Sequence, residues 1–144
     1  ALSIPNNTFD FLGFTFYWSK PGGAKASLKF KTQKKTLLKK IREFYAWIKS
    51  IRSRLKLKEI WELAKLKLIG HYNYYGYAWN RAKLSYFYQE AIRSLFKWLN
   101  RRSQMKSYDW DSFLRRLGNL PLPVPPPMNQ LKHLKNGRSA VCLN

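Results

Sequence analysis

The acidic residues of this sequence are few and scattered. Seven of its 144 residues are Asp or Glu. Glu59 and Glu62 are a pair that one helix face would bring together, but the lysines around them indicate a solvated surface rather than an acid–base dyad. Asp109 and Asp111 lie about 200° apart around a helix. Two-metal nuclease or polymerase chemistry needs clustered carboxylates, so the sequence does not predict such a centre.

Other residue types that could perform chemistry are equally sparse. The sequence has one cysteine, Cys142, which excludes an internal disulfide, and two histidines, which cannot alone complete a four-ligand zinc site. It contains neither a nucleophile-elbow motif nor a Gly-Lys-Ser/Thr phosphate loop. We therefore expect no catalytic residue, no metal and no cofactor. His71 stands in a run of tyrosines, and we interpret it as a packed, hydrogen-bonded, neutral side chain.

Basic residues give the strongest signal. Lys and Arg number 28, for a net charge of +21, whereas a hydrophobic content of 45% is too high for a disordered basic tail. A folded domain with this charge attracts polyanions, and nucleic acid is the leading candidate. A cationic protein of membrane surfaces is the alternative from another class. It ranks lower because the aromatic residues fit buried stripes, and no apolar run approaches the ~20 residues that cross a bilayer.

The basic side chains recur at helical spacing. Lys35, Arg42 and Lys49 are seven residues apart on one face, and a second row on a later helix repeats every four residues. Tyr74 and Tyr77 are predicted to point away from the core, where they could stack on a base or donate to a phosphate. The residues that we expect to bind RNA are Lys35, Lys39, Arg42, Lys49, Tyr74, Arg93, Lys97, Arg101 and Arg102.

A β-hairpin is predicted before the first helix. Residues 9–17 are aromatic and partly alternating, which is typical of a strand, and residues 26–31 can return as a second strand after a Pro-Gly-Gly turn. This hairpin carries more apolar surface than two strands can hide. We therefore interpret it as an element that another domain would cover. We expect the helices to stay folded, and to be more soluble, without residues 1–30.

Helical periodicity dominates the rest of the chain. The pattern predicts a helix over 33–54 with Thr32 as its N-cap, a second over 57–68, and a separate helical segment between Gly70 and Gly76. A further helix over 81–102 has Asn80 as its cap. The residues predicted to form buried stripes are Leu37, Ile41, Phe44, Ile48 and Ile51 in the first helix, Ile60, Trp61, Ala64 and Leu68 in the second, and Leu84, Phe87, Ala91, Leu95 and Trp98 in the helix over 81–102.

The last predicted helix is short and is followed by a proline-rich segment. Ser107 or Asp109 is its expected cap, its apolar residues include Phe113 and Leu114, and Gly118 is expected to stop it. Five prolines between 121 and 127 then impose an extended backbone. The predicted fold is mainly α: a β-hairpin over 1–32, helices over 33–118, and a Pro-rich extended segment with a polar, flexible tail over 119–144.

Four blocks of the sequence resemble, in order, the C-terminal part of bacterial group II intron-encoded proteins, which are reverse transcriptases and maturases. Residues 9–14 (FDFLGF) resemble the last conserved reverse-transcriptase block, at the end of the palm. Residues 70–76 (GHYNYYG) resemble the core of the maturase-specific domain. Residues 95–103 resemble its helix with paired arginines, and residues 107–110 followed by 120–123 (LPLP) resemble its closing element.

The resemblance implies a thumb domain, also called domain X, which is a bundle of largely parallel helices. It implies binding to the structured RNA of a group II intron, in support of RNA folding and splicing, in the bacterial cytoplasm and without a membrane. The alternative within the family is a thumb of an RNA-directed DNA polymerase that grips an RNA–DNA hybrid beside the palm and fingers. The catalytic Tyr-Ala-Asp-Asp block and the Cys-rich endonuclease of the family are absent from this sequence, so we expect that the chain on its own is not an enzyme.

Overall fold

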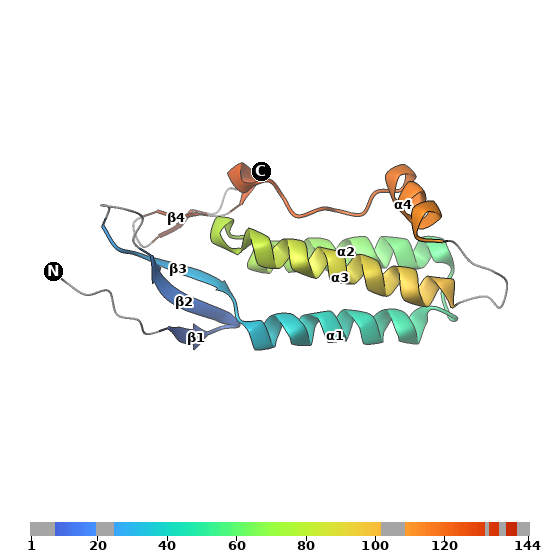
Figure 1. The fold of residues 1–144 in the computed structure, drawn as a ribbon, viewed down its shortest axis with the longest axis horizontal. Coiled ribbons are helices and arrows are strands. Elements are labelled where there is room, and N and C mark those ends of the chain that lie inside the picture. Colours follow the sequence, from blue (N-terminus) through green and yellow to red (C-terminus); the bar gives the residue numbers. More distant parts are fainter. Residues whose placement is uncertain (1–7, 20–24, 102–108, 132, 136–137, 141–144) are drawn as a thin grey trace.

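The chain is mainly helical and carries a small antiparallel sheet near its N-terminus. Figure 1 shows long helices lying along one another, with the sheet at one end of them. The computed structural model describes residues 8–19, 25–101, 109–131, 133–135 and 138–140.

Three long helices form the body of the molecule. They are α1 (Lys34–Ile51), α2 (Leu57–Tyr75) and α3 (Arg81–Asn100). The α2 helix runs opposite to α1 and α3 (Figure 1). The predicted apolar stripes of α2 and α3 are confirmed, because all their residues are buried. In α1, Leu37, Phe44 and Ile48 are buried, whereas Ile41 and Ile51 are half-buried against the core. The core therefore lies between the three helices, as their periodicity requires.

The α2 helix is longer than predicted. Gly70 was expected to separate two helical segments, but α2 continues through it without interruption. One glycine inside a helix costs about 1 kcal/mol relative to alanine, which is less than the burial of Leu68, Tyr72 and Tyr75 around it contributes. The helix ends at Gly76, where a Cβ would collide with the carbonyl oxygen of Tyr72. Only glycine fits at that end.

The sheet has three strands rather than the predicted two. Its order is β1 (Phe9–Phe11), β2 (Phe14–Ser19) and β3 (Ser27–Thr32), all antiparallel. The single strand predicted over 9–17 is broken at Leu12 and Gly13, whose φ angles are 51° and 82°. Positive φ at both positions is typical of a two-residue hairpin loop, and it pairs Phe11 with Phe14. A leucine in this conformation is uncommon, which is why the sequence did not reveal the turn.

Two residues that were predicted to be helix caps have another role. Asn80 is the residue before α3, as predicted, but its side chain makes no capping hydrogen bond, and the residue before α1 is Gln33 rather than Thr32. Instead, the Thr32 backbone N–H donates to Asn80 Oδ1 at 2.7 Å. Asn80 Nδ2 donates to Thr32 Oγ1 at 2.6 Å and to the Tyr75 carbonyl at 3.0 Å. Both side chains are buried, so this network ties β3 to the turn between α2 and α3.

A short helix, α4 (Trp110–Asn119), lies near the end of the bundle away from the sheet (Figure 1). Asp109 caps it as predicted, because its Oδ1 accepts from the Ser112 backbone N–H at 2.8 Å. Hydrogen bonds from Ser112 hold the pKa of Asp109 below its usual value. The helix passes Gly118, which was expected to stop it, and ends one residue later. Phe113 is buried and Leu114 is exposed.

The proline-rich segment 120–127 runs back along the helices toward the sheet (Figure 1). It contains neither helix nor strand. Three of its carbonyl oxygens accept hydrogen bonds from the bundle: Leu120 from Trp61 Nε1 at 2.9 Å, Pro123 from the Tyr72 hydroxyl at 2.7 Å, and Pro126 from Arg81 Nη1 at 2.7 Å. Prolines lack the N–H but keep the carbonyl acceptor, so this segment binds the helices through acceptors.

The described residues after this segment are not the frayed tail that was predicted. A 3₁₀ turn, η2 (Met128–Gln130), precedes an antiparallel pair of strands, β4 (His133–Lys135) and β5 (Arg138–Ala140). Leu122 and Leu131 belong to the same buried cluster as Phe14 and Phe30 of the sheet. Residues from the sheet, the helices and the proline-rich segment therefore share one core.

Candidate nucleic-acid interface

Most basic side chains in the described ranges have no acidic partner. The ion pairs there join residues three or four apart on one helix, with N–O distances of 2.7 to 4.0 Å. Exposed pairs of this kind contribute at most about 1 kcal/mol each. They are Lys39–Glu43, Lys40–Glu43, Lys65–Glu62 and Arg93–Glu90. These ion pairs therefore compensate only a small part of the positive charge.

The predicted RNA-binding residues are exposed but do not form one continuous row. Arg102 lies outside the described residues, and the other eight are all exposed. Lys39 and Arg93 pair with neighbouring glutamates. Lys35 and Arg42 line a shallow pocket of about 460 Å³ between α1 and the sheet, where Asp10 is also present.

The other predicted cations gather around one aromatic ring. Arg52 Cζ lies 4.6 Å from the centroid of the Trp98 ring, Lys97 Nζ 5.3 Å, and Lys49 Nζ and Arg101 Cζ both 5.4 Å. We call these four cations with Trp98 the Trp98 cluster. It joins the last turn of α1 to the last turn of α3, which pack against each other. Arg52 was not predicted, because its proximity to Trp98 depends on how the two helices pack.

Two N–H groups in the Trp98 cluster lack acceptors. Arg52 Nη1 and Trp98 Nε1 are both buried without a hydrogen-bond partner. A buried donor without a partner costs about 1–3 kcal/mol, and more when it is charged. The cluster also contains Lys97, whose Nζ donates to the Tyr45 hydroxyl at 2.6 Å. Because both N–H groups are closed off from solvent, the exposed cations Lys49, Lys97 and Arg101 are the groups of this site that suit an oxyanion ligand.

The fold itself explains how like charges can gather there. Lys49 and Arg52 lie at the C-terminal end of α1, and Lys97 and Arg101 lie at that of α3. Helix C-termini carry partial negative charge and stabilise cations by about 0.3–1 kcal/mol. The face of a tryptophan ring attracts cations as well. These contributions offset the repulsion but leave the net charge of the cluster unchanged.

The tyrosines after Gly70 divide between core and surface. Tyr72 and Tyr75 are buried, as predicted. Tyr74 is exposed, as predicted, but its hydroxyl donates to the Leu12 carbonyl at 3.1 Å and its ring stacks on Phe14. The prediction for Tyr77 was wrong, since its ring packs against Phe14 and Phe30. The Tyr77 ring is therefore in contact with aromatic rings of the sheet.

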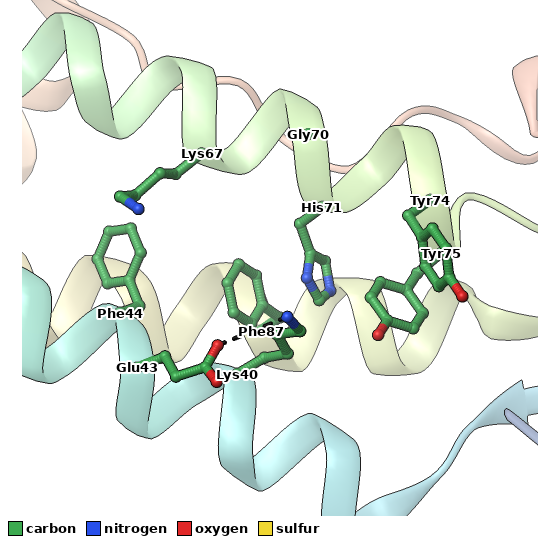
Figure 2. A pocket seen from close by; sticks show the side chains of 9 residues that line it. All are labelled: Lys40, Glu43, Phe44, Lys67, Gly70, His71, Tyr74, Tyr75 and Phe87. Carbon is green, nitrogen blue, oxygen red and sulfur yellow. Dashed lines mark ion pairs between the residues drawn. The ribbon is translucent and has the colours of Figure 1, made fainter. Parts of the chain in front are cut away.

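A pocket of about 440 Å³ lies between the three long helices. Figure 2 shows the side chains that line it. Aromatic rings from all three helices form its walls: Phe44 from α1, Tyr74 and Tyr75 from α2, and Phe87 from α3. Lys40, Glu43 and Lys67 add charged groups, and Gly70 and His71 complete the lining on α2.

His71 is packed and neutral, as predicted, but it is not fully hydrogen-bonded. Its ring stacks on Phe87 with a centroid distance of 3.7 Å and an interplanar angle of 7°. Burial, together with the nearby charge of Lys40, lowers the pKa of His71 from 6.5 to about 4. Its Nε2 atom is buried without a partner. The pocket wall therefore contains a ring nitrogen whose hydrogen-bonding capacity is unused.

We expect the stability of the protein to fall in mild acid because of His71. Its folded-state pKa lies below the unfolded value, so the stabilisation is present above the unfolded pKa and is lost as the pH falls toward the folded one. From about pH 7 to pH 5 the loss amounts to about 2 kcal/mol in the free energy of unfolding. Urea denaturation at each pH measures it. His71→Phe keeps a ring on Phe87 and should remove this dependence, and an equal pH dependence in that variant would contradict the assignment.

No protein-family model, curated protein or solved structure matches this chain. Across the described ranges, no three His, Cys, Asp or Glu side chains converge as a metal site would require. None of the helices in those ranges is both long and apolar enough to cross a membrane.

Proposed function

We propose that this chain is an RNA-binding domain whose Trp98 cluster holds phosphates of the RNA backbone. The observation that carries the proposal is the convergence of four cations on the Trp98 ring, with Lys49, Lys97 and Arg101 exposed to solvent. Phosphate oxygens are the acceptors that Arg and Lys bind most readily in nucleic acids. A net charge of +21 adds a long-range attraction to any polyanion.

The resemblance to group II intron maturases supports a more specific form of the proposal. The block over 95–103 includes Lys97, Trp98 and Arg101 of the Trp98 cluster, and the block over 70–76 contributes Gly70 and His71 to the pocket. In this form, α1–α3 are the helices of a thumb, although α2 runs opposite to the other two rather than parallel to them, and the domain binds intron RNA to support its folding and splicing. Catalysis of splicing then belongs to the RNA.

The second candidate is the thumb of an RNA-directed DNA polymerase. It is favoured by the same cluster, because backbone phosphates are present in a template–primer duplex as well as in a folded intron. The two candidates differ in the preferred ligand. If the protein has a higher affinity for an RNA–DNA hybrid than for an RNA hairpin of equal length, the result favours the polymerase thumb.

The proposal is tested by removing charge from the Trp98 cluster. We expect Lys49→Gln/Lys97→Gln/Arg101→Gln to weaken binding to a fully paired RNA hairpin. It should also reduce the slope of log K against log salt by about 2–3 units, because each lost phosphate contact removes about 0.7–0.9. Fluorescence anisotropy of the labelled hairpin over about 50–200 mM salt measures both quantities.

A matched variant separates the cluster from the overall charge. Lys25→Gln/Lys29→Gln/Lys83→Gln removes the same three charges from β3, the residues before it, and the start of α3. It should change the slope by less than half as much. Equal changes in both variants would exclude the Trp98 cluster as the site. Failure of the unaltered protein to bind the hairpin would refute the proposed function itself.

A further inference from the structure

The pocket between the three helices has the dimensions and lining of a site for a small planar ligand. Its volume of about 440 Å³ falls within the ~300–1,000 Å³ of typical ligand sites. Phe44, Tyr74 and Phe87 approach it from three different helices (Figure 2). Because Phe87 stacks on His71 and Tyr74 stacks on Phe14, these rings give a nucleobase an apolar surface to pack against. The Trp98 cluster does not share any of these residues.

Gly70 leaves the pocket open on the α2 side. A Cβ built on it would meet nothing within 4 Å, and the residue is exposed. The helix continues through this position, so the glycine is not needed for a turn. Its effect on the structure is the free space beside His71.

His71 offers the pocket an unsatisfied polar atom. Its Nε2 is buried and unpartnered, and its ring lies in the pocket wall between Phe87 and Tyr75. Figure 2 shows the ring extending from α2 toward the space between the helices. Buried polar atoms without partners are rare in native proteins. The edge of a nucleobase carries both donors and acceptors, so it can satisfy either tautomer of the imidazole.

Two lysines in the pocket lining are placed to bind the phosphate of such a ligand. Lys40 of α1 and Lys67 of α2 both line the pocket. The Lys40 Nζ atom lies 3.5 Å from Glu43 Oε2. No ion pair of Lys67 occurs among the described residues, and the Lys67 Nζ atom lies 4.8 Å from the centroid of the Trp47 ring. A charged rim around an aromatic interior matches a nucleotide better than it matches a purely apolar ligand.

We propose that this pocket binds one unstacked nucleotide of an RNA, with the base packed on the aromatic lining against His71 and the phosphate on Lys67 and Lys40. The inference rests on the proposed function and deepens it, because it adds recognition of an unpaired base to contacts with the backbone. Unpaired, splayed bases are the part of RNA that proteins read most directly.

Two RNA hairpins and one substitution test the pocket. The hairpins differ by a single unpaired adenosine bulge. Wild-type protein should bind the bulged hairpin about tenfold more tightly than the paired one, in the range of stacking of one base on aromatic side chains. Gly70→Leu fills the pocket with a good helix former, and it should reduce that ratio to about one. Its affinity for the paired hairpin and its salt slope should stay at the wild-type values.

A second glycine supplies the control. Gly118 in α4 is also helical with open space around it, so Gly118→Leu makes the same change away from the pocket and should keep the tenfold ratio. Adenosine monophosphate should shift the NMR signals of the His71 ring in the wild type and not in Gly70→Leu. Equal binding of both hairpins by the wild type, or a ratio that survives Gly70→Leu, overturns the inference. If the wild-type protein does not bind the paired hairpin at all, the proposed function itself is refuted.

Discussion

Deleting residues 1–30 is expected to abolish the cooperative unfolding of this protein. The sequence suggested the opposite, namely that the helices would fold without the strands. In the structure, Phe14 and Phe30 are 8% and 4% exposed and belong to the core. The Phe14 ring contacts Tyr75, and the Phe30 ring contacts Tyr77 and Trp79. Removing one buried phenylalanine costs about 3–5 kcal/mol, so losing both approaches the ~5–15 kcal/mol that stabilises a domain.

Thermal melting followed by circular dichroism measures this effect. Deletion should convert a sigmoidal transition into a gradual one, and Phe14→Ala/Phe30→Ala should lower the midpoint strongly in the intact chain. Phe9→Ala/Phe11→Ala is the matched control, since these side chains are 51% and 60% exposed in the same sheet. It should cost less than about 1–2 kcal/mol. A truncated chain that melts cooperatively at the wild-type temperature would restore the interpretation of the strands as a separate element.

Asn80→Ala is expected to destabilise the protein by about 3–5 kcal/mol. The side chain is fully buried and makes three hydrogen bonds to Thr32 and Tyr75. Its removal leaves the Thr32 N–H, the Thr32 hydroxyl and the Tyr75 carbonyl without that partner. Each unsatisfied buried group costs about 1–3 kcal/mol, although such terms are not additive.

Urea denaturation and a double-mutant cycle measure the Asn80 network. Thr32→Val removes the hydroxyl that accepts from Asn80 Nδ2, so the double variant should lose less than the sum of the two single variants. In hydrogen exchange, the Thr32 amide should lose its protection in Asn80→Ala. Asn119→Ala, at the exposed end of α4, makes the same change outside the network and should cost under about 1 kcal/mol. Strict additivity of Asn80 and Thr32 would show that the network is not a unit.

Local periodicity was sufficient to predict α1, α3 and their buried faces, whereas it ended α2 too early, before Gly70. In α3, the spacing of Leu84, Phe87, Ala91, Leu95 and Trp98 places one stripe on one side, and packing then buries it. The same reasoning failed where a residue's local preference competed with a distant partner. Thr32 and Asn80 have the composition of helix caps, but each finds a partner 48 residues away. No local pattern contains that information.

The candidate site was predicted only in part, for a related reason. Lys97 and Arg101 were placed on one face of α3 from their spacing alone, and Lys49 on α1. Their convergence on Trp98, and the addition of Arg52, depend on the register between α1 and α3. The unused Nε2 of His71 likewise depends on the stacking of Phe87 and Tyr75 around it. The sequence pattern shows which side chains lie on the same face of a helix, but tertiary packing determines which side chains of different helices lie close together.

The proline-rich segment imposes an order on folding during protein synthesis. The donors Trp61, Tyr72 and Arg81 precede their carbonyl acceptors by 59, 51 and 45 residues, so they leave the ribosome first. Until residues 120–126 emerge, the Tyr72 hydroxyl and the Trp61 N–H must find water instead, and the surface that Leu122 covers stays open. Long-range contacts of this kind form late. A chain that ends with α3 therefore leaves the surface under Leu122 in contact with water, so the bundle is completed only when the proline-rich segment has been made.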